Sequence, residues 1–337
     1  MTRRLLLDAS SLMYRAYFAL PTSITDGRGQ AINAAHGYLD MCARLVRDRR
    51  PQELVHAFDA DWRPAPRVER YEAYKATRKE EPEDLGPQFD IVARVVGAAG
   101  MTVVEAPGWE AEDAIGTLCA TAPKRDRVEI VTGDRDLIQL VRDPTVRLLF
   151  TRRGVSEVDD LDEAGVEAKY GVPPSRYAEY AILRGDPSDE LPGVPGVGEK
   201  TARALVQAYP SIDAMLTEAS GTATRRPLKG APGLKARLAG SAEYVAAMRD
   251  VVPIRTDLDL ESQQQDRDDE ALDALGSRHR LTGPIRRLRE ALEATGRRRA
   301  GGRRRPGGPA DGTGRARPVG RPGHPSGGRS PGAGPAR

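Results

Sequence analysis

The chain has little cysteine, no long apolar run and no excess of positive charge over most of its length. Its 337 residues include only two cysteines, Cys42 and Cys119. Their isolation excludes a disulfide framework and a cysteine-ligated metal site, so we expect two reduced core thiols. No apolar stretch approaches the roughly 20 residues of a membrane helix. The start, Met1 to Asp8, turns acidic too soon for a signal peptide, so we expect a cytoplasmic protein without a membrane partner.

Charge is unevenly distributed along the chain. Residues 297–337 contain eleven arginines and one aspartate, whereas the whole chain has a net charge of +3, so residues 1–296 carry −7. An acidic body does not attract phosphate by itself. It can do so if its acids cluster and bind divalent cations, which then present positive charge to a nucleic acid.

The last 41 residues differ from the rest in composition. With twelve glycines, seven prolines and almost no apolar side chain larger than valine, residues 297–337 cannot build a core, and we expect them to be disordered. Their arginines would add a salt-sensitive, sequence-independent attraction to nucleic acid. A passive solubilising tail is the alternative.

Apolar runs that end in an acid predict an α/β fold. The runs Leu5–Asp8, Leu54–Asp59 and Val128–Asp134 have this form, and Met101–Glu105 and Val146–Phe150 are two further expected strands. Helical patterns lie between them at about 33–50, 88–99, 110–122 and 134–142. Alternating strands and helices predict a parallel, doubly wound sheet. Ligands bind at the carboxyl ends of such strands, where Asp8, Asp59 and Asp134 fall.

The stretch Gly185–Ala202 combines two kinds of chemistry. Asp186 and Asp189 are spaced to converge on one hard cation such as Mg²⁺. Gly196 and Gly198 then permit close backbone approach, and the N–H groups that open a helix at 199–208, with Lys200 beside them, form an anion site. The alternative is an Asp/Pro/Gly loop that only caps a helix.

Further acids follow the predicted strands. Glu110, Glu112 and Asp113 open a helix and could serve only its dipole, and Asp134 with Asp136 could be an N-cap and its neighbour. So many carboxylates in one crevice would repel one another unless cations were bound. The candidate metal ligands are Asp8, Asp59, Glu110, Glu112, Asp113, Asp134, Asp136, Asp186 and Asp189.

A basic and aromatic segment lies between Trp62 and Glu83. Arg67, Tyr71, Tyr74, Lys75 and Arg78 recur at i, i+4, i+7, i+8 and i+11, which predicts one face of a helix. Tyrosines interleaved with cations suit stacking on unpaired bases while the cations hold the phosphate backbone. A solvated basic face is the alternative.

Five acidic blocks, in this order and approximate spacing, resemble the bacterial 5′→3′ exonucleases, a family that includes the flap endonucleases and the N-terminal domain of bacterial DNA polymerase I. The blocks are Asp8 with Leu12–Tyr17, Phe58–Ala60, Glu110–Asp113, Thr132–Leu137 and Gly185–Ala202. The resemblance implies a PIN-like (resolvase-like) nuclease domain over 1–172 with a helical arch at about 62–83. A helix–hairpin–helix subdomain over 173–296 and the tail 297–337 would follow, without a polymerase-like continuation.

The resemblance also implies an activity: hydrolysis of DNA, and of RNA primers on DNA, at free 5′ ends, flaps and nicks by two Mg²⁺ ions, with Mn²⁺ as a substitute. One ion would be held by Asp8, Asp59, Glu110, Glu112 and Asp134, and the other by Asp113, Asp136, Asp186 and Asp189. Lys75, Arg78, Arg15 and Tyr74 would act at the scissile phosphate. DNA would be bound by Arg67, Tyr71, Gly193, Gly196, Gly198, Lys200 and Thr201, with K⁺ as a possible ion at the hairpin. We expect a monomer that acts in DNA replication and repair.

Two departures from the family pattern leave other functions open. Glu112 stands where the family usually has Asp, and Glu190 stands where it usually has Asn. A catalytically impaired protein that binds DNA structures is therefore one alternative. A PIN-type ribonuclease is the other, although it predicts neither the hairpin at Gly193–Lys200 nor the arch.

Overall fold

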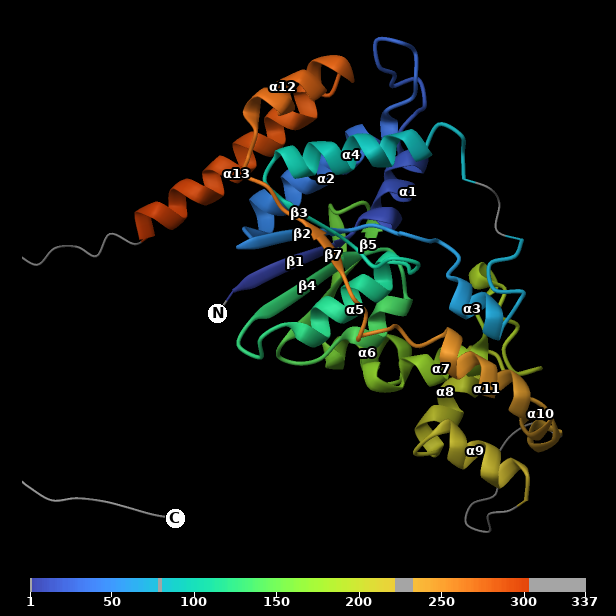
Figure 1. Cartoon of the computed structure of the whole chain (residues 1–337). Helices are drawn as coiled ribbons and strands as arrows, with labels where there is room; N and C mark the ends of the chain where they lie inside the picture. Colours follow the sequence, from blue (N-terminus) through green and yellow to red (C-terminus); the bar gives the residue numbers. More distant parts are fainter. Residues whose placement is uncertain (1, 78–80, 222–232, 303–337) are drawn as a thin grey trace, which may run out of the picture.

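A mostly parallel sheet is the centre of the computed structural model, which describes residues 2–77, 81–221 and 233–302 (Figure 1). Within these residues the sheet has seven strands in the order β6-β5-β4-β1-β2-β3-β7. Neighbours from β5 to β3 pair in parallel, and the edge strands β6 and β7 pair antiparallel. The strands are β1 (Arg3–Asp8), β2 (Glu53–Ala57), β3 (Thr102–Glu105), β4 (Arg127–Thr132), β5 (Val146–Arg153), β6 (Glu157–Leu161) and β7 (Glu261–Gln263). The predicted parallel α/β architecture is confirmed.

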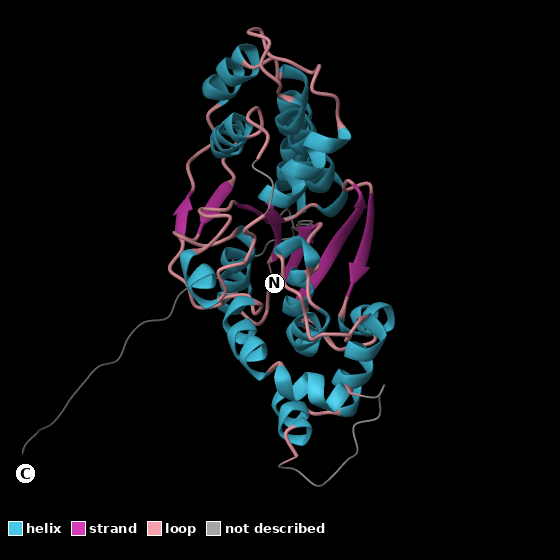
Figure 2. Cartoon of the chain, turned by 90° about the vertical axis from the view of Figure 1, so that its right-hand side faces the viewer, coloured by secondary structure: helices cyan, strands magenta, loops and turns pink. Residues whose placement is uncertain are grey.

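Helices cover both faces of the sheet because its central strands are apolar on both sides. In β1, Leu5 and Leu7 pack into one buried cluster and Leu6 packs into the other. Figure 1 shows α2 and α4 over one face and α5 and α6 under the other, and Figure 2 shows the same layers from the side. The helices of the layers are α1 (Ala9–Ala19), α2 (Asn33–Arg49), α4 (Gly86–Ala98), α5 (Ala111–Thr121) and α6 (Glu163–Tyr170).

A second group of helices lies beyond the carboxyl edge of the sheet (Figure 1). It consists of α7 (Tyr177–Arg184), α8 (Glu199–Ala208), α9 (Ile212–Ala219), α10 (Leu234–Gly240) and α11 (Ala242–Val251), with the short α3 (Ala65–Arg70) packed beside α11. The helix at 199–208 was predicted with these bounds. No helix in the described ranges is both long enough and apolar enough to cross a bilayer.

The chain then returns to the sheet. Strand β7 pairs with β3, and α12 (Asp269–Arg278) then packs on α4. Helix α13 (Thr282–Gly302) packs on α2, where Arg287 Nε donates to Asp40 Oδ1 at 2.7 Å. The helical subdomain is therefore shorter than the predicted range 173–296. Helix α13 continues to Gly302, six residues into the range 297–337 that was predicted to be disordered. The rest of the predicted tail, 303–337, lies outside the described residues.

Two predicted helices are corrected. Residues 134–142 contain only the 3-10 helix η1 (Asp136–Leu140), because the Asp134 carboxylate accepts from the Asp136 N–H at 2.9 Å and Val141 is extended. The helix expected through Arg67, Tyr71, Tyr74 and Lys75 ends with α3 at Arg70, since Tyr71 is extended with φ of −151°. The helices α1, α6, α7, α10 and α12 and the edge strands β6 and β7 were not predicted.

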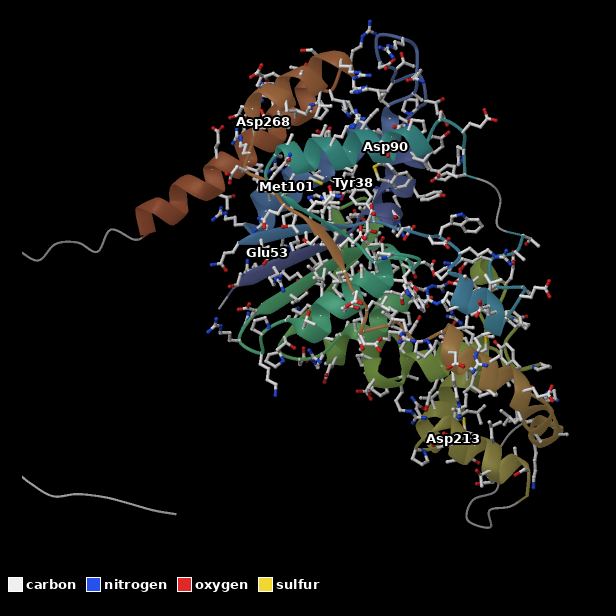
Figure 3. The ribbon with its side chains drawn as sticks, viewed as in Figure 1. Tyr38, Glu53, Asp90, Met101, Asp213 and Asp268 are labelled. Carbon is white, nitrogen blue, oxygen red and sulfur yellow. The ribbon has the colours of Figure 1, made fainter. Side chains whose placement is uncertain are left out.

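A buried polar group lies between the sheet and α2. The Tyr38 hydroxyl is 2.6 Å from His56 Nδ1, and Met101 Sδ is 3.4 Å from His56 Nε2; Figure 3 labels Tyr38 and Met101. Burial lowers the pKa of His56 to about 3, so the imidazole is neutral and serves packing. Cys42 and Cys119 are also buried and unpaired, as predicted.

Helix α5, which carries Glu112 and Asp113 and begins directly after Glu110, is held by a close backbone contact at Gly116. A Cβ on Gly116 would lie 2.3 Å from the Arg255 carbonyl oxygen and 2.5 Å from Ile254 Cγ2. We predict that Gly116→Ala lowers the free energy of unfolding by about 1–3 kcal/mol through overpacking, although alanine favours helix. Urea denaturation measures this. Gly97→Ala is the matched control, because its Cβ would meet only Gln265 Nε2 at 3.7 Å; equal stability of the two variants would contradict the prediction.

Candidate functional site

Acids from four parallel strands meet in one cavity at the carboxyl edge of the sheet. The cavity has a volume of about 620 Å³, and Lys75 and Arg15 line it together with the acids. Asp8 ends β1, and Asp59, Glu110 and Asp134 follow β2, β3 and β4. The acids that line it are Asp8, Asp59, Glu110, Glu112 and Asp134. The strand order thus brings together residues that are up to 126 positions apart in the chain.

Asp8 and Asp59 are fixed by hydrogen bonds that orient their carboxylates. Asp8 accepts from the Ser11 N–H at 3.0 Å and from the Thr132 hydroxyl at 2.5 Å, and Asp59 accepts from the Ala111 N–H at 2.7 Å. Burial raises the pKa of Asp8 to about 7, with Asp134 and Asp59 adding to the rise. Burial and the neighbouring Glu110 raise the pKa of Asp59 to about 6. Both shifts show that the cavity disfavours further negative charge without a cation.

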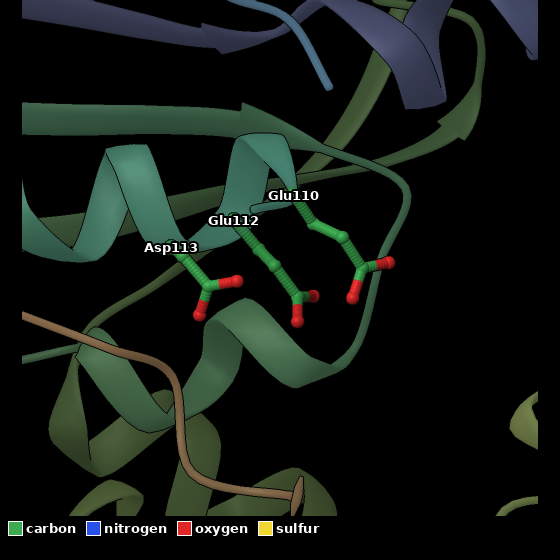
Figure 4. A group of neighbouring side chains, drawn as sticks. All are labelled: Glu110, Glu112 and Asp113. Atoms are coloured by element: carbon green, nitrogen blue, oxygen red, sulfur yellow. The ribbon is translucent and has the colours of Figure 1, made fainter. Parts of the chain in front are cut away.

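Helix α5 directs three carboxylates to one side. Figure 4 shows Glu110, Glu112 and Asp113 pointing the same way from its first turn, and one oxygen of each lies within 4.8 Å of the others. Arg67 contacts all three: its guanidinium is 2.5 Å from Glu110, 3.3 Å from Glu112 and 2.9 Å from Asp113. Only 1% of Arg67 is exposed. A protein cation therefore already offsets part of the negative charge of this group.

Glu110 is the most heavily paired of these acids. Besides Arg67, the Tyr74 hydroxyl donates to it at 2.7 Å and the Lys75 ammonium forms an ion pair with it. Burial by itself would raise the pKa of the Glu110 carboxyl, but Lys75 and Arg67 outweigh burial and hold this pKa below its usual range. Glu110 is therefore ionised, and it keeps the Lys75 ammonium at the cavity wall.

A second acidic group has the character of a divalent-metal site. Glu112, Asp134 and Asp136 each place one oxygen within 4.8 Å of the other two. Burial raises the pKa of both Glu112 and Asp136 well above their usual ranges, and the neighbouring carboxylates Glu110 and Asp134 respectively raise them further. An all-oxygen set of this charge fits Mg²⁺ or Mn²⁺. Glu112, which is one methylene longer than aspartate, thus contacts Arg67 and also belongs to the group with Asp134 and Asp136.

Asp186 and Asp189 lie next to this group, in the loop after α7. Asp186 accepts from the Ser188 N–H at 2.9 Å and from Arg184 Nη2 at 3.2 Å. Asp189 Oδ1 is 3.7 Å from Lys75 Nζ. Burial raises the pKa of Asp189 to about 6, although Lys75 opposes the rise. Lys75 thus lies between Glu110, which belongs to the group paired with Arg67, and Asp189, which lies next to the second acidic group.

Three residues have a different environment from the one predicted. Arg67, expected on a DNA-facing helix, is buried among acids and also donates to the Val251 carbonyl at 2.9 Å. Asp113, expected as a metal ligand, has both oxygens bound by Arg67 at 2.9 Å and is not exposed. Tyr74, expected to stack on bases, is 2% exposed beneath Glu110. The spacing could not show this, because it assumed a helix beyond Arg70.

The structure describes the surroundings of two further predicted residues, Tyr71 and Arg15. Tyr71 is half-buried, and its ring packs on Tyr244 with centroids 6.4 Å apart. Arg78 lies outside the described residues. Arg15 donates to the Gly133 carbonyl at 3.0 Å from α1 and lines the cavity.

The hairpin between α7 and α8 presents its second half to solvent. Gly193 is buried, its N–H donates to the Tyr244 hydroxyl at 3.0 Å, and a Cβ there would lie 2.5 Å from the Arg184 carbonyl oxygen. Gly193 is therefore needed for a backbone crossing, and its predicted DNA contact stays a prediction. Gly196, Gly198 and Lys200 are exposed where α8 begins, and Thr201 is half-buried.

Two cations at the cavity were missed by sequence reasoning. Arg152 and Arg153, at the end of β5, line the cavity beside Gly154. Arg152 Nε is also 2.9 Å from Asp159 Oδ1. Their signal was a pair of arginines one residue after the predicted strand Val146–Phe150, at the edge of the sheet where the acids gather.

Comparisons with known proteins match most of the described architecture. The family model described as "5'-3' exonuclease, N-terminal resolvase-like domain" matches residues 3–171, and the model described as "5'-3' exonuclease, C-terminal SAM fold" matches residues 172–274. The 5'-3' exonuclease of Streptomyces coelicolor is 41% identical over 307 residues, which cover 86% of this chain and 100% of the relative. The DNA polymerase I of Mycobacterium bovis is 41% identical over 271 residues, which cover 78% of this chain and 29% of the polymerase.

A solved structure shares the fold. It is the flap endonuclease of bacteriophage T5 in a complex with DNA and metal ions, with a TM-score of 0.58 and 17% identity. The alignment covers 87% of this chain and 99% of the phage protein.

The buried Arg67 gives a prediction about stability. We predict that Arg67→Ala lowers the free energy of unfolding by about 3–5 kcal/mol, because it leaves buried carboxylates without their cation. Chemical denaturation at neutral pH in EDTA measures this. The matched control is Arg70→Ala on the same helix: the Arg70 side chain is 60% exposed and pairs only with Asp250 among the described residues, so its loss should cost about 0–1 kcal/mol. Equal losses for the two variants would contradict the prediction.

Proposed function

The chain belongs to the 5′-3′ exonuclease family, and from this premise we propose that it hydrolyses DNA phosphodiester bonds at free 5′ ends and flaps with the help of divalent metal ions. The observation that carries the proposal is the cavity in which acids from four strand ends surround a buried lysine. This donor set fits hard divalent cations, and the cations would let an acidic surface accept a phosphodiester.

We propose two Mg²⁺ ions, with Mn²⁺ as a substitute. Glu112, Asp134 and Asp136 would hold one side of the pair, and Asp186 with Asp189 the other. Asp8, Asp59 and Glu110 would complete the cavity wall. When bound, the ions would supply the positive charge that stabilises an in-line displacement at phosphorus.

The chain's own cations would orient the scissile phosphate. Lys75 would meet it as an electrophilic partner from the cavity wall, where Glu110 and Asp189 hold the ammonium. Arg15 would approach it from α1, and Arg78 would act from the segment after Lys75. Tyr74 would support them indirectly, by donating its hydroxyl to Glu110. Arg152 and Arg153 would receive the substrate backbone at the rim.

Duplex DNA would lie along the α7–α8 hairpin. The exposed backbone at Gly196 and Gly198 and the start of α8, with Lys200 and Thr201, would bind phosphates, and K⁺ would share this site. Such contacts position the duplex without reading its sequence, so structure would decide the choice of substrate: nicks, flaps and RNA primers on DNA. These substrates place the activity in replication and repair. The nuclease part would comprise about residues 1–172 and the helix–hairpin–helix part would follow it.

Loss of one acid tests the proposed chemistry. We predict that Asp134→Asn lowers the rate of cleavage of a 5′-labelled flap duplex in Mg²⁺ by roughly 100- to 1,000-fold, the range for loss of one electrostatic group in an active site. The thermal midpoint in EDTA should not fall, because the change removes like-charge repulsion. Asp273→Asn is the control, since this carboxylate is 71% exposed on α12 and pairs with Arg289.

Cleavage by the parent chain that persists in EDTA would contradict the metal dependence. A parent chain that binds the flap but never cuts it in Mg²⁺ or Mn²⁺ would overturn the nuclease assignment in favour of a DNA-structure-binding protein. Cleavage of single-stranded RNA in preference to the flap would favour a ribonuclease.

DNA-binding measurements test the proposed phosphate contacts of the α7–α8 hairpin. We predict that Lys200→Ala weakens binding to a nicked duplex and reduces the slope of log affinity against log salt by about 1, because one phosphate contact is lost. Fluorescence anisotropy in Ca²⁺ over a salt series measures both. The control is Lys124→Ala, which removes an exposed lysine before β4, at the opposite edge of the sheet. An unchanged slope for Lys200→Ala would exclude the hairpin as a phosphate site.

A further inference from the structure

Glu190, one of the two departures from the family pattern, binds the segment that carries Lys75. Its carboxylate oxygens accept from the Thr77 N–H at 2.7 and 2.9 Å, and the Thr77 hydroxyl also donates to it. Glu190 has a left-handed backbone with φ of +61°, directly after Asp189. The two partners are 113 positions apart in the sequence, so the contact joins the loop after α7 to the chain after α3.

A second contact with the same loop lies at Lys75, two residues before Thr77. The Lys75 N–H donates to the Asp189 carbonyl at 3.2 Å. Consecutive residues of the loop thus hold the backbone on both sides of Ala76. Arg63 Nε also donates to the Tyr74 carbonyl at 2.7 Å, one residue before Lys75.

These contacts surround a strained residue. Lys75 has φ of +51°, a left-handed conformation that a lysine adopts only when its surroundings enforce it. Its side chain is 5% exposed, paired with Glu110 and 3.7 Å from Asp189. In this left-handed conformation the Lys75 side chain lines the cavity. We therefore attribute the backbone strain to the placement of the ammonium.

We propose that Glu190 is a positioning residue: by holding Thr77, it keeps Lys75 in its left-handed conformation with the ammonium in the cavity before DNA binds. An asparagine at this position would be one methylene shorter, whereas Oε1 of the glutamate reaches both the N–H and the hydroxyl of Thr77. The inference rests on the proposed function, because Lys75 acts on the phosphate only if the cavity is a nuclease site.

A double-mutant cycle distinguishes positioning from an ordinary surface contact. In single-turnover cleavage of a 5′-labelled flap in Mg²⁺, we expect Glu190→Ala to lower the cleavage rate roughly 10- to 100-fold, the cost of a misplaced catalytic group. The concentration of enzyme that gives half-maximal rate should not change. Glu190→Gln, which keeps one acceptor oxygen, should recover most of the rate. In a Lys75→Ala background, Glu190→Ala should cost nothing further.

Backbone exchange gives a readout that does not depend on cleavage. Hydrogen exchange of the peptide that covers 71–77, without DNA or metal, should be faster in Glu190→Ala than in the parent chain and near the parent rate in Glu190→Gln. Glu290→Ala is the control, because this glutamate is 63% exposed on α13, remote from the cavity. It should change neither exchange nor cleavage.

The outcomes separate the inference from the function on which it rests. If the parent chain does not cleave the flap, the proposed function fails, and the exchange result still shows whether Glu190 holds the segment. If the parent chain cleaves and Glu190→Ala cleaves at the same rate, positioning by Glu190 is overturned. The same holds if Glu190→Ala loses the same factor with and without Lys75, because its effect would then not pass through that lysine.

Discussion

Repulsion among carboxylates at one edge of the sheet is the constraint on which the rest of the structure depends. Parallel pairing places the ends of β1, β2, β3 and β4 side by side, and an acid ends or follows each of them. Two like charges 4 Å apart repel by about 4 kcal/mol even at an effective dielectric constant of 20. The protein offsets part of this repulsion with Arg67 and Lys75 and leaves the rest for bound cations.

Both compensating cations, Arg67 and Lys75, come from the chain between β2 and α4. The contacts of Arg67 also fix α11 relative to α5. Arg67 joins the first turn of α5 to α11, because the same guanidinium binds Asp113 and the Val251 carbonyl. Asp113 also accepts from the Arg255 N–H at 2.9 Å, where the chain leaves α11 for the sheet. The ion pairs of Arg67 thus also fix the helical subdomain against the carboxyl edge, so the proposed metal site and the proposed duplex site would share one set of contacts.

The sequence was informative where local patterns decide the structure and uninformative where distant partners decide it. Buried parallel strands are continuous apolar runs, so the acids at their ends could be located from Leu5–Asp8 and Val128–Asp134 alone. Helical spacing placed Arg67 on an exposed face, but the chain turns extended at Tyr71 and the arginine enters a cluster of acids more than 40 positions away. The spacing of the glycines also could not show that Gly193 permits a backbone crossing at Arg184.

The return of the chain through β7 makes the helical subdomain an insertion between two parts of the sheet domain. Its path leaves after α6 and comes back to pair with β3, so both ends are anchored. A module joined by one linker samples a volume set by the linker, whereas this one has a high effective concentration at the acidic edge at all times. If duplex DNA binds at the hairpin as proposed, the fold would therefore keep it at a fixed distance from the acidic cavity.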